Sequence, residues 1–171
     1  IAHPDVEDFI TIKQDLQKVT GANISIRLSD EFMKAVENNA EYTHKWPIDS
    51  ETPKFSKTVK AKELWNTIIE CAHNTAEPGL IFWDRQHWYS TSSVYPGYKN
   101  TSTNPCSEIA MQGGDSCRLI AINLFNFVEN PFTKDAKFLI EDFYKSTYEG
   151  QSLMVDLVDL EIEDIVRILR K

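Results

Sequence analysis

Asn104-Pro105-Cys106-Ser107-Glu108, followed closely by Asp115-Ser116-Cys117, is the stretch on which the interpretation of this chain depends. Alternate side chains of an extended segment point the same way, so Asn104, Cys106 and Glu108 would share one face if this loop is extended. An amide, a thiol and a carboxylate on one face could hydrogen-bond a hydroxylated substrate, attack it through sulfur and move a proton. The second thiol, in the later stretch, makes two-electron dithiol chemistry a further option.

Composition indicates a soluble globular protein of one domain. The chain has 171 residues, of which 42% are hydrophobic and 26% are charged, and this length allows a sizeable core. The net charge is −8 and the sequence pI is near 5.0. Because no basic stripe is available to neutralise phosphates, we expect no nucleic-acid partner. No apolar run approaches the roughly 20 residues of a membrane span, so we expect no membrane partner either.

The N-terminus and the cysteines predict a cytoplasmic fragment. Ile1 is not a methionine, which indicates a fragment, an engineered piece or a processed product. No N-terminal segment has the order of charged, apolar and small residues that marks a secretory signal. Three cysteines, an odd number, argue against a secreted disulfide framework and favour reduced thiols. The histidines are scattered, and Cys106 and Cys117 lack the short spacing of a zinc pair, so we expect no metal site.

Hydrophobic periodicity predicts a mixed α/β fold. Helical spacing predicts helices at about 3–19, 30–38, 61–75, 134–148 and 152–170. Ser29 and Asp30 can cap the second of these helices. Alternation and short apolar runs predict strands at 23–28, 80–83 and 119–124. Residues 41–59 indicate loop or edge strand, and residues 86–103 indicate a long loop that ends at the Asn104 motif.

Several motifs of this sequence resemble those of ribonucleotide reductase catalytic subunits. The central motif of that family is similar to Asn104-Pro105-Cys106-Ser107-Glu108-Ile109, Asp115-Ser116-Cys117-Arg118-Leu119 and Ile122-Asn123-Leu124. Further segments that look like the family, in the same order, are 3–10, 23–26, 30–33 and 77–82. The proline in the Asn-Pro-Cys triplet and residues 158–163 look most like the adenosylcobalamin-dependent class.

The resemblance implies a ten-stranded α/β barrel with a finger loop inside it. Residues 1–171 would be a single central segment of that barrel domain, with the finger loop at about 100–118. By resemblance, adenosylcobalamin homolysis oxidises Cys106 to a thiyl radical that removes the 3′ hydrogen of the ribose. Glu108 matches the general base for the 3′-hydroxyl proton, and Asn104 matches the amide that binds the ribose hydroxyls. Cys117 matches one member of the dithiol that donates electrons while the 2′-hydroxyl leaves as water.

The resemblance also implies partners that the parent protein would use. These are a ribonucleotide substrate, dNTP effectors, a thioredoxin-like reductant and the remaining reductase segments, and a homodimer is a further option. The partner cysteine of Cys117 and the effector loop would lie upstream of Ile1. The phosphate-binding loop would lie downstream of Lys171. We therefore expect the isolated chain to have no reductase activity.

The sequence departs from the family pattern at a few positions. Ser107 and Ile109 stand where Gly and Gln are frequent in the cobalamin class. Arg118 and Ile120 stand where Asn and Gly are frequent. Cys71 matches no redox cysteine of the family, and we expect it to pack within its helix.

Two other functions stay open on the residues alone. The chain could be a folded, non-catalytic module that associates with separately encoded reductase segments. It could also be a hydrolase with Cys106 as nucleophile, since a Cys–His pair meets only in space. An aromatic cluster is open to two interpretations, a base-stacking surface or packing of the long loop, and we expect packing. Its members are Trp83, Trp88, Tyr89, Tyr95 and Tyr98.

Overall fold

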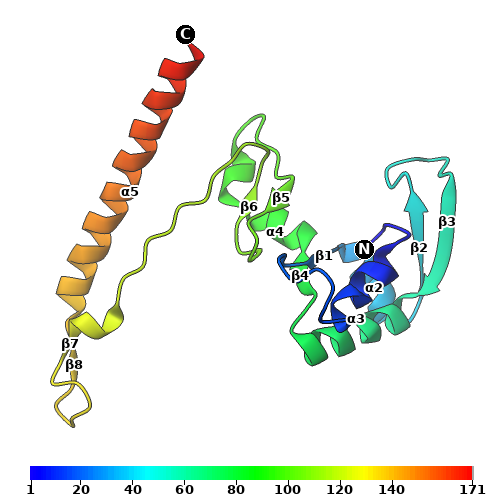
Figure 1. Cartoon of the computed structure of the whole chain (residues 1–171), viewed down its shortest axis with the longest axis horizontal. Coiled ribbons are helices and arrows are strands. Elements are labelled where there is room, and N and C mark those ends of the chain that lie inside the picture. The colour runs from blue at the N-terminus through cyan, green and yellow to red at the C-terminus, as the bar shows by residue number, and fades with distance from the viewer. Residues whose placement is uncertain (171) are drawn as a thin grey trace. The chain divides into compact units, whose positions relative to one another are not determined.

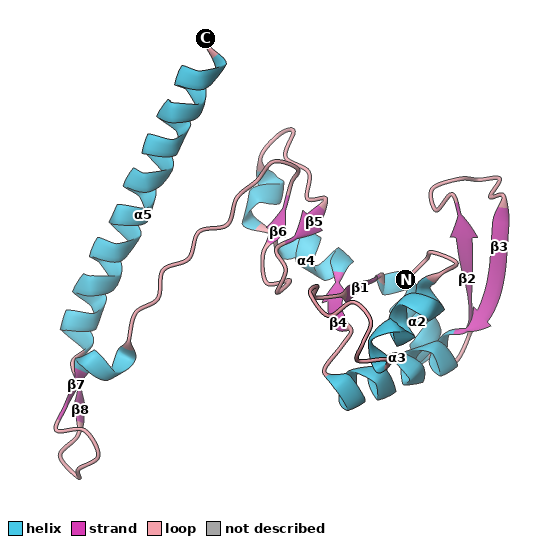
Figure 2. Cartoon of the chain, in the orientation of Figure 1, coloured by secondary structure: helices cyan, strands magenta, loops and turns pink. Residues whose placement is uncertain are grey.

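The computed structural model describes residues 1–170 and divides the chain into two compact units. Unit 1 is Ile1–Ser116 and unit 2 is Cys117–Lys171. The elements of each unit are drawn in Figure 1 and coloured by type in Figure 2. The prediction of a single segment of one barrel domain stays a prediction, and each unit is described by itself.

Unit 1 contains most of the secondary structure. Its elements are α1 (Val6–Thr11), the 3-10 helix η1 (Ile12–Gln14), β1 (Ser25–Leu28), α2 (Asp30–Glu37), β2 (Glu41–Trp46), β3 (Phe55–Lys60), α3 (Ala61–Thr75), β4 (Gly79–Phe82), α4 (Trp83–Tyr89), the 3-10 helix η2 (Thr91–Val94), β5 (Ser102–Thr103) and β6 (Ala110–Met111). Its core gathers side chains from α1, β1, α2, β2 and α3.

The strand β1 organises this core. It pairs in parallel with β4, in a register that sets Ser25 opposite Gly79. The alternation expected at 23–28 is confirmed, because Ile24, Ile26 and Leu28 are all buried. Parallel strands need a crossover connection, and α2, the β2–β3 hairpin and α3 provide it here.

The helices α2 and α3 confirm two predictions. The Ser29 hydroxyl accepts a hydrogen bond from the Phe32 N–H at 3.1 Å, which caps α2 as expected. Phe32 is fully buried, with its ring edge-on to Tyr42 at 5.1 Å between centroids. The helix α3 has the predicted bounds, and its buried residues are Ala61, Leu64, Ile68 and Cys71.

One prediction for unit 1 is narrowed and two need correction. Of the alternatives for 41–59, loop or edge strand, edge strand is confirmed, because β2 and β3 pair as a two-stranded antiparallel hairpin. The first helix ends at Thr11, and the chain beyond η1 turns away. Leu16 is 74% exposed. Its apolar side chain is therefore not packed against the core, and burial does not stabilise a longer helix. The long loop expected at 86–103 contains the end of α4, the 3-10 helix η2 and the short strand β5.

Unit 2 is built on one long helix. Its elements are the 3-10 helix η3 (Leu124–Phe127), β7 (Val128–Glu129), β8 (Lys137–Phe138) and α5 (Ile140–Leu169). The two helices expected at 134–148 and 152–170 are confirmed as helical from Ile140 to Leu169, but the predicted break between them is wrong, since α5 runs without interruption (Figure 2). The predicted start at 134 is also wrong, because Lys137–Phe138 is the strand β8. Gly150 does not break it. A Cβ there would lie 2.7 Å from Ile120 Cδ1, so the glycine lets the preceding segment approach the helix.

The strand expected at 119–124 is also wrong. Residues 119–123 have no regular structure, and Leu119 is 83% exposed. A strand needs a partner for its backbone groups, and none of the described residues pairs with this segment. Arg118 instead forms an ion pair with Glu161 of α5.

The fold class is mixed α/β, as predicted. In the part of the chain from 1 to 170, the strands form four separate two-stranded sheets. The barrel expected from the resemblance is therefore not closed by these residues.

The imidazole of His44 is buried in unit 1, and this predicts that the stability of the unit depends on pH. His44 is fully buried, and neither ring nitrogen has a hydrogen-bond partner among the described residues. Burial lowers the pKa of His44 below its ordinary 6.5, against the opposing effect of the Glu7 carboxylate and with a further lowering by Lys57. Below pH 6.5 the unfolded chain therefore binds a proton that the folded chain does not.

We expect the free energy of unfolding to fall as pH drops from about 6.5, with this residue contributing at most about 1.4 kcal/mol per pH unit. Urea unfolding at pH 7.5 and pH 5.5 measures the change in the free energy of unfolding. His44→Phe should reduce the difference between the two pH values, whereas His73→Asn, at an exposed site, should preserve it. An unchanged difference in His44→Phe would contradict the assignment.

Candidate functional site

The predicted site residues lie on the loop of a short hairpin. The strands β5 and β6 pair Ser102 with Met111 and Thr103 with Ala110. The Thr101 N–H extends this pairing by donating to the Met111 carbonyl at 2.8 Å. The connecting loop, 104–109, carries Asn104, Cys106 and Glu108, so one tight structure presents all three.

The loop is a turn, not an extended segment. The Ser107 N–H donates to the Asn104 carbonyl at 3.0 Å, and the Asn104 N–H donates to the Ile109 carbonyl at 3.2 Å. The Asn104 side-chain oxygen accepts from the Ile109 N–H at 3.0 Å. The alternation argument for a shared face therefore does not apply. Asn104 stabilises the turn through its oxygen, while its Nδ2 group makes no hydrogen bond within residues 1–170.

Cys106 and Glu108 are both exposed on this loop. The thiol makes no hydrogen bond to a histidine among residues 1–170, so the structure provides no Cys–His pair here. A thiol that is open to solvent can be reached by a substrate or cofactor. It also lacks the enclosure that protects a radical from water.

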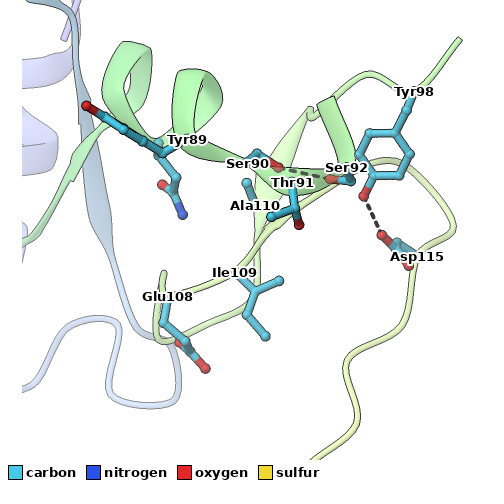
Figure 3. Close-up of a pocket in the computed structure, with 10 residues that line it drawn as sticks. Tyr89, Ser90, Thr91, Ser92, Tyr98, Glu108, Ile109, Ala110 and Asp115 are labelled. Carbon is cyan, nitrogen blue, oxygen red and sulfur yellow. Dashed lines mark hydrogen bonds between the residues drawn. The ribbon is translucent and has the colours of Figure 1, made fainter. Parts of the chain in front are cut away.

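Glu108 lines a cavity of about 510 Å³ between the hairpin and the chain that follows α4. Figure 3 shows hydroxyl, phenol and carboxyl side chains around it beside Ile109 and Ala110, although most of the exposed wall surface is apolar. The lining residues are Gln86, Tyr89, Ser90, Thr91, Ser92, Tyr98, Glu108, Ile109, Ala110 and Asp115. The Tyr98 hydroxyl donates to Asp115 at 2.7 Å, and the Ser90 and Ser92 hydroxyls are 2.9 Å apart. Such a wall can hydrogen-bond a polyhydroxylated ligand beside the Glu108 carboxylate.

The three cysteines have different environments. Cys71 is buried in the core, and burial, reinforced by Glu70, raises the pKa of its thiol. This confirms that it packs within α3, and it makes Cys71 a poor redox partner. Cys117 is partly exposed and belongs to unit 2. Its pairing with any other thiol stays a prediction.

The aromatic residues near α4 do not pack as expected. Trp83 receives the Arg27 guanidinium 3.8 Å from its ring centroid, and burial lowers the pKa of Arg27 against the effect of Asp84. Trp88, however, is 80% exposed, and Tyr89 and Tyr95 are exposed as well. The packing prediction is wrong for these three residues in this chain.

Two residues that sequence reasoning missed contact the loop. The Gln86 side chain donates to the Ser107 carbonyl at 3.0 Å, and the Ser25 and Ser107 hydroxyls are 3.2 Å apart. No local pattern signals either contact, because 82 positions separate Ser25 from Ser107 and 21 separate Gln86 from it.

The described part of the chain offers neither a metal site nor a membrane helix. Across residues 1–170, no three His, Cys, Asp or Glu side chains are grouped closely enough to hold a metal ion. Over the same residues, no helix combines the length and apolar character that crossing a membrane requires.

Comparison with known proteins gives a consistent match. The model of the ribonucleotide reductase barrel domain family matches residues 1–167. A vitamin B12-dependent ribonucleoside-diphosphate reductase of Thermoplasma acidophilum is 32% identical over 176 residues, covering 99% of this chain and 22% of that protein. A vitamin B12-dependent ribonucleotide reductase of Rhodopirellula baltica is 33% identical, covering 85% of this chain and 14% of that protein.

A vitamin B12-dependent ribonucleoside-diphosphate reductase of Mycobacterium tuberculosis is 33% identical over 126 residues, covering 72% of this chain and 17% of that protein. The chain thus spans between 14% and 22% of the length of these three relatives.

Proposed function

This chain belongs to the ribonucleotide reductase family through its barrel domain, and on that premise we propose that it carries the reducing loop of a protein that converts ribonucleotides to deoxyribonucleotides. The observation that supports this function best is the single turn, 104–109, that presents Asn104, Cys106 and Glu108 together, with Glu108 lining a cavity.

In this proposal Cys106 is the hydrogen-atom carrier. Its thiyl radical takes the 3′ hydrogen of the ribose, which re-forms the S–H bond and leaves a carbon radical on the sugar. The exposed position of the sulfur supports this role, since atom transfer requires direct contact. The rest of the barrel domain then supplies the enclosure that a radical requires.

Glu108 and Asn104 handle the ribose hydroxyls. Glu108 is the general base for the 3′-hydroxyl proton, which it can accept only within hydrogen-bond distance. The uncommitted Nδ2 group of Asn104 donates to a ribose oxygen, while its side-chain oxygen holds the turn. The hydroxyl groups of Ser90, Thr91 and Ser92 in the cavity wall orient the sugar.

Cys117 is one thiol of the reducing pair. Two thiols become a disulfide, and their two electrons and two protons replace the 2′ C–O bond by C–H and release water. The second thiol comes from outside this chain, because Cys71 is buried in the core of unit 1. A thioredoxin-like reductant then restores the pair.

The cofactor that fits this site is adenosylcobalamin. The relatives are named as vitamin B12-dependent enzymes, at about a third identity. When bound, the cofactor supplies the one-electron oxidation that removes the hydrogen atom from the Cys106 thiol. The exposed sulfur of Cys106 is compatible with this role, because a cofactor can reach it.

The whole protein supplies the other partners. Ribonucleotide phosphates, dNTP effectors and a second subunit bind to reductase segments outside this chain. The exposed apolar side chains of α5 support such an arrangement, because a 30-residue helix with apolar residues in contact with solvent gains stability when they are covered.

The decisive test is product formation by the full-length protein with ribonucleotide, dithiol and adenosylcobalamin. We expect deoxyribonucleotide only when the cofactor is present, and none from the 171-residue chain alone. Activity without adenosylcobalamin would contradict the cofactor assignment. If the full-length protein loaded with the cofactor formed no deoxyribonucleotide, the proposed function would be wrong. Product from the isolated chain would overturn the inactivity of the fragment.

A further inference from the structure

We propose that Ser25 and Gln86 are positioning residues that fix the reactive loop through Ser107, an inference that rests on the proposed function. Both residues lie on elements outside the hairpin. Neither is among the residues that the sequence motif assigns to the chemistry.

The two contacts to Ser107 come from two different elements, α4 and β1. Gln86 donates its side-chain N–H to the Ser107 carbonyl at 3.0 Å, and Ser25 shares a hydrogen bond between hydroxyls at 3.2 Å. Ser107 is partly buried, whereas its neighbours Cys106 and Glu108 are exposed. The loop is therefore anchored at the residue between its two reactive side chains.

The backbone of Ser107 explains why an anchor is needed there. Its φ is +71°, in the left-handed region that residues with a Cβ rarely adopt. A glycine would adopt this conformation freely but would offer no hydroxyl. Serine is strained in this conformation, but its hydroxyl can hydrogen-bond that of Ser25. The direction of the Cys106 and Glu108 side chains then depends on this one fixed peptide.

The two anchoring residues are themselves held by rigid elements. Ser25 is the first residue of β1, which is part of the core of unit 1. Gln86 is in α4, which continues directly from β4, the strand paired with β1. Arg27 of β1 adds a weaker contact to the base of the hairpin, at 3.5 Å from the Thr101 carbonyl. The position of the loop is thus fixed relative to the paired strands β1 and β4.

Gly79 leaves room for this arrangement. It lies opposite Ser25 in the register, and a Cβ at this position would be 2.7 Å from the Ser25 hydroxyl oxygen. An added methyl group would force that hydroxyl to turn away from Ser107. Gly79→Ala is therefore a variant that breaks the contact without removing either partner.

The first test measures the loop itself by hydrogen–deuterium exchange of the full-length protein. We expect Ser25→Ala, Gln86→Ala and Gly79→Ala each to speed exchange of the amides in 104–109 by about fivefold, the effect of one lost hydrogen bond. Ser56→Ala and Gln17→Ala, at exposed sites away from the loop, serve as controls. Wild-type exchange in all three variants would overturn the anchoring.

The second test measures kcat and KM for deoxyribonucleotide formation. Small displacements of reacting groups are costly, so we expect kcat to fall by about tenfold or more while KM stays within about twofold. A merely structural defect would instead lower the amount of folded enzyme and leave kcat per folded molecule unchanged. An unchanged kcat, or a rise in KM alone, would overturn the catalytic part of the inference.

A double-mutant cycle tests the Ser25–Ser107 contact directly. Ser25→Ala, Ser107→Ala and the double variant should show the same kcat, because each removes the same hydrogen bond. Independent, additive losses of kcat would overturn the contact.

The anchoring of the loop and the proposed function can be tested separately. Inactive wild-type protein whose loop still loosens in the variants would refute the proposed function and keep the anchor, whereas active wild-type protein with insensitive variants would refute the anchor alone.

Discussion

Full-length protein carrying Cys106→Ser is expected to lose deoxyribonucleotide formation by at least about 10,000-fold in kcat, the scale seen when an essential reacting group is removed. Serine has nearly the same size as cysteine, but its O–H bond does not give up a hydrogen atom under these conditions. The hydrogen bonds of the loop come from Asn104 and Ser107, not from the thiol. The substitution should therefore leave the turn intact.

Cys71→Val is the matched control for that experiment. Cys71 is buried and packs within α3, so its replacement by a small apolar residue should change stability but not kcat per folded molecule. The measurement is the single-turnover rate with adenosylcobalamin. A Cys106→Ser enzyme that kept a tenth of the wild-type rate would rule out the sulfur as the hydrogen-atom carrier.

Phe32→Ala is expected to destabilise unit 1 by about 3–5 kcal/mol, the usual cost of replacing a buried Phe. Phe32 is fully buried in the core beside β1, and its ring contacts Tyr42 edge-on. A loss of this size approaches the whole stability of a typical domain. Since β1 carries Ser25, the anchor of the reactive loop should be lost with the core.

Urea unfolding of the 171-residue chain, followed by circular dichroism, measures this effect. Phe132 is 95% exposed, so Phe132→Ala should shift the free energy of unfolding by less than about 0.5 kcal/mol. If Phe32→Ala unfolded at the same urea concentration as the wild type, the packing of unit 1 around Phe32 would be wrong.

Local sequence pattern was sufficient to predict secondary structure where the deciding interactions join residues that are near in sequence. The burial alternation of β1, the Ser29 cap of α2 and the bounds of α3 could all be predicted, because period and capping act between near neighbours. Pattern failed where a segment depends on what lies beside it. For 41–59 the sequence left loop and edge strand open, and the structure shows that β2 and β3 pair with each other. For 119–124 it predicted a strand, but no described residue pairs with this segment.

Gly150 shows the same limit within a single element. A glycine in a helix interior normally lowers helix stability, which favours a break between two helices. In the structure, α5 continues through it, and the missing side chain makes room for Ile120. The reason for the glycine lies in a distant segment, so helix propensity alone could not predict it.

The sequence by itself determined the family, and it indicated the loop that we propose as reactive, because Asn104, Cys106 and Glu108 are close along the chain. Only the tertiary structure decided how that loop is held. It shows a turn where an extended segment was expected, and it brings Ser25 and Gln86 to Ser107 from β1 and α4. The physical reason is that hydrogen bonds between distant residues depend on where the chain folds back, which a local pattern does not encode.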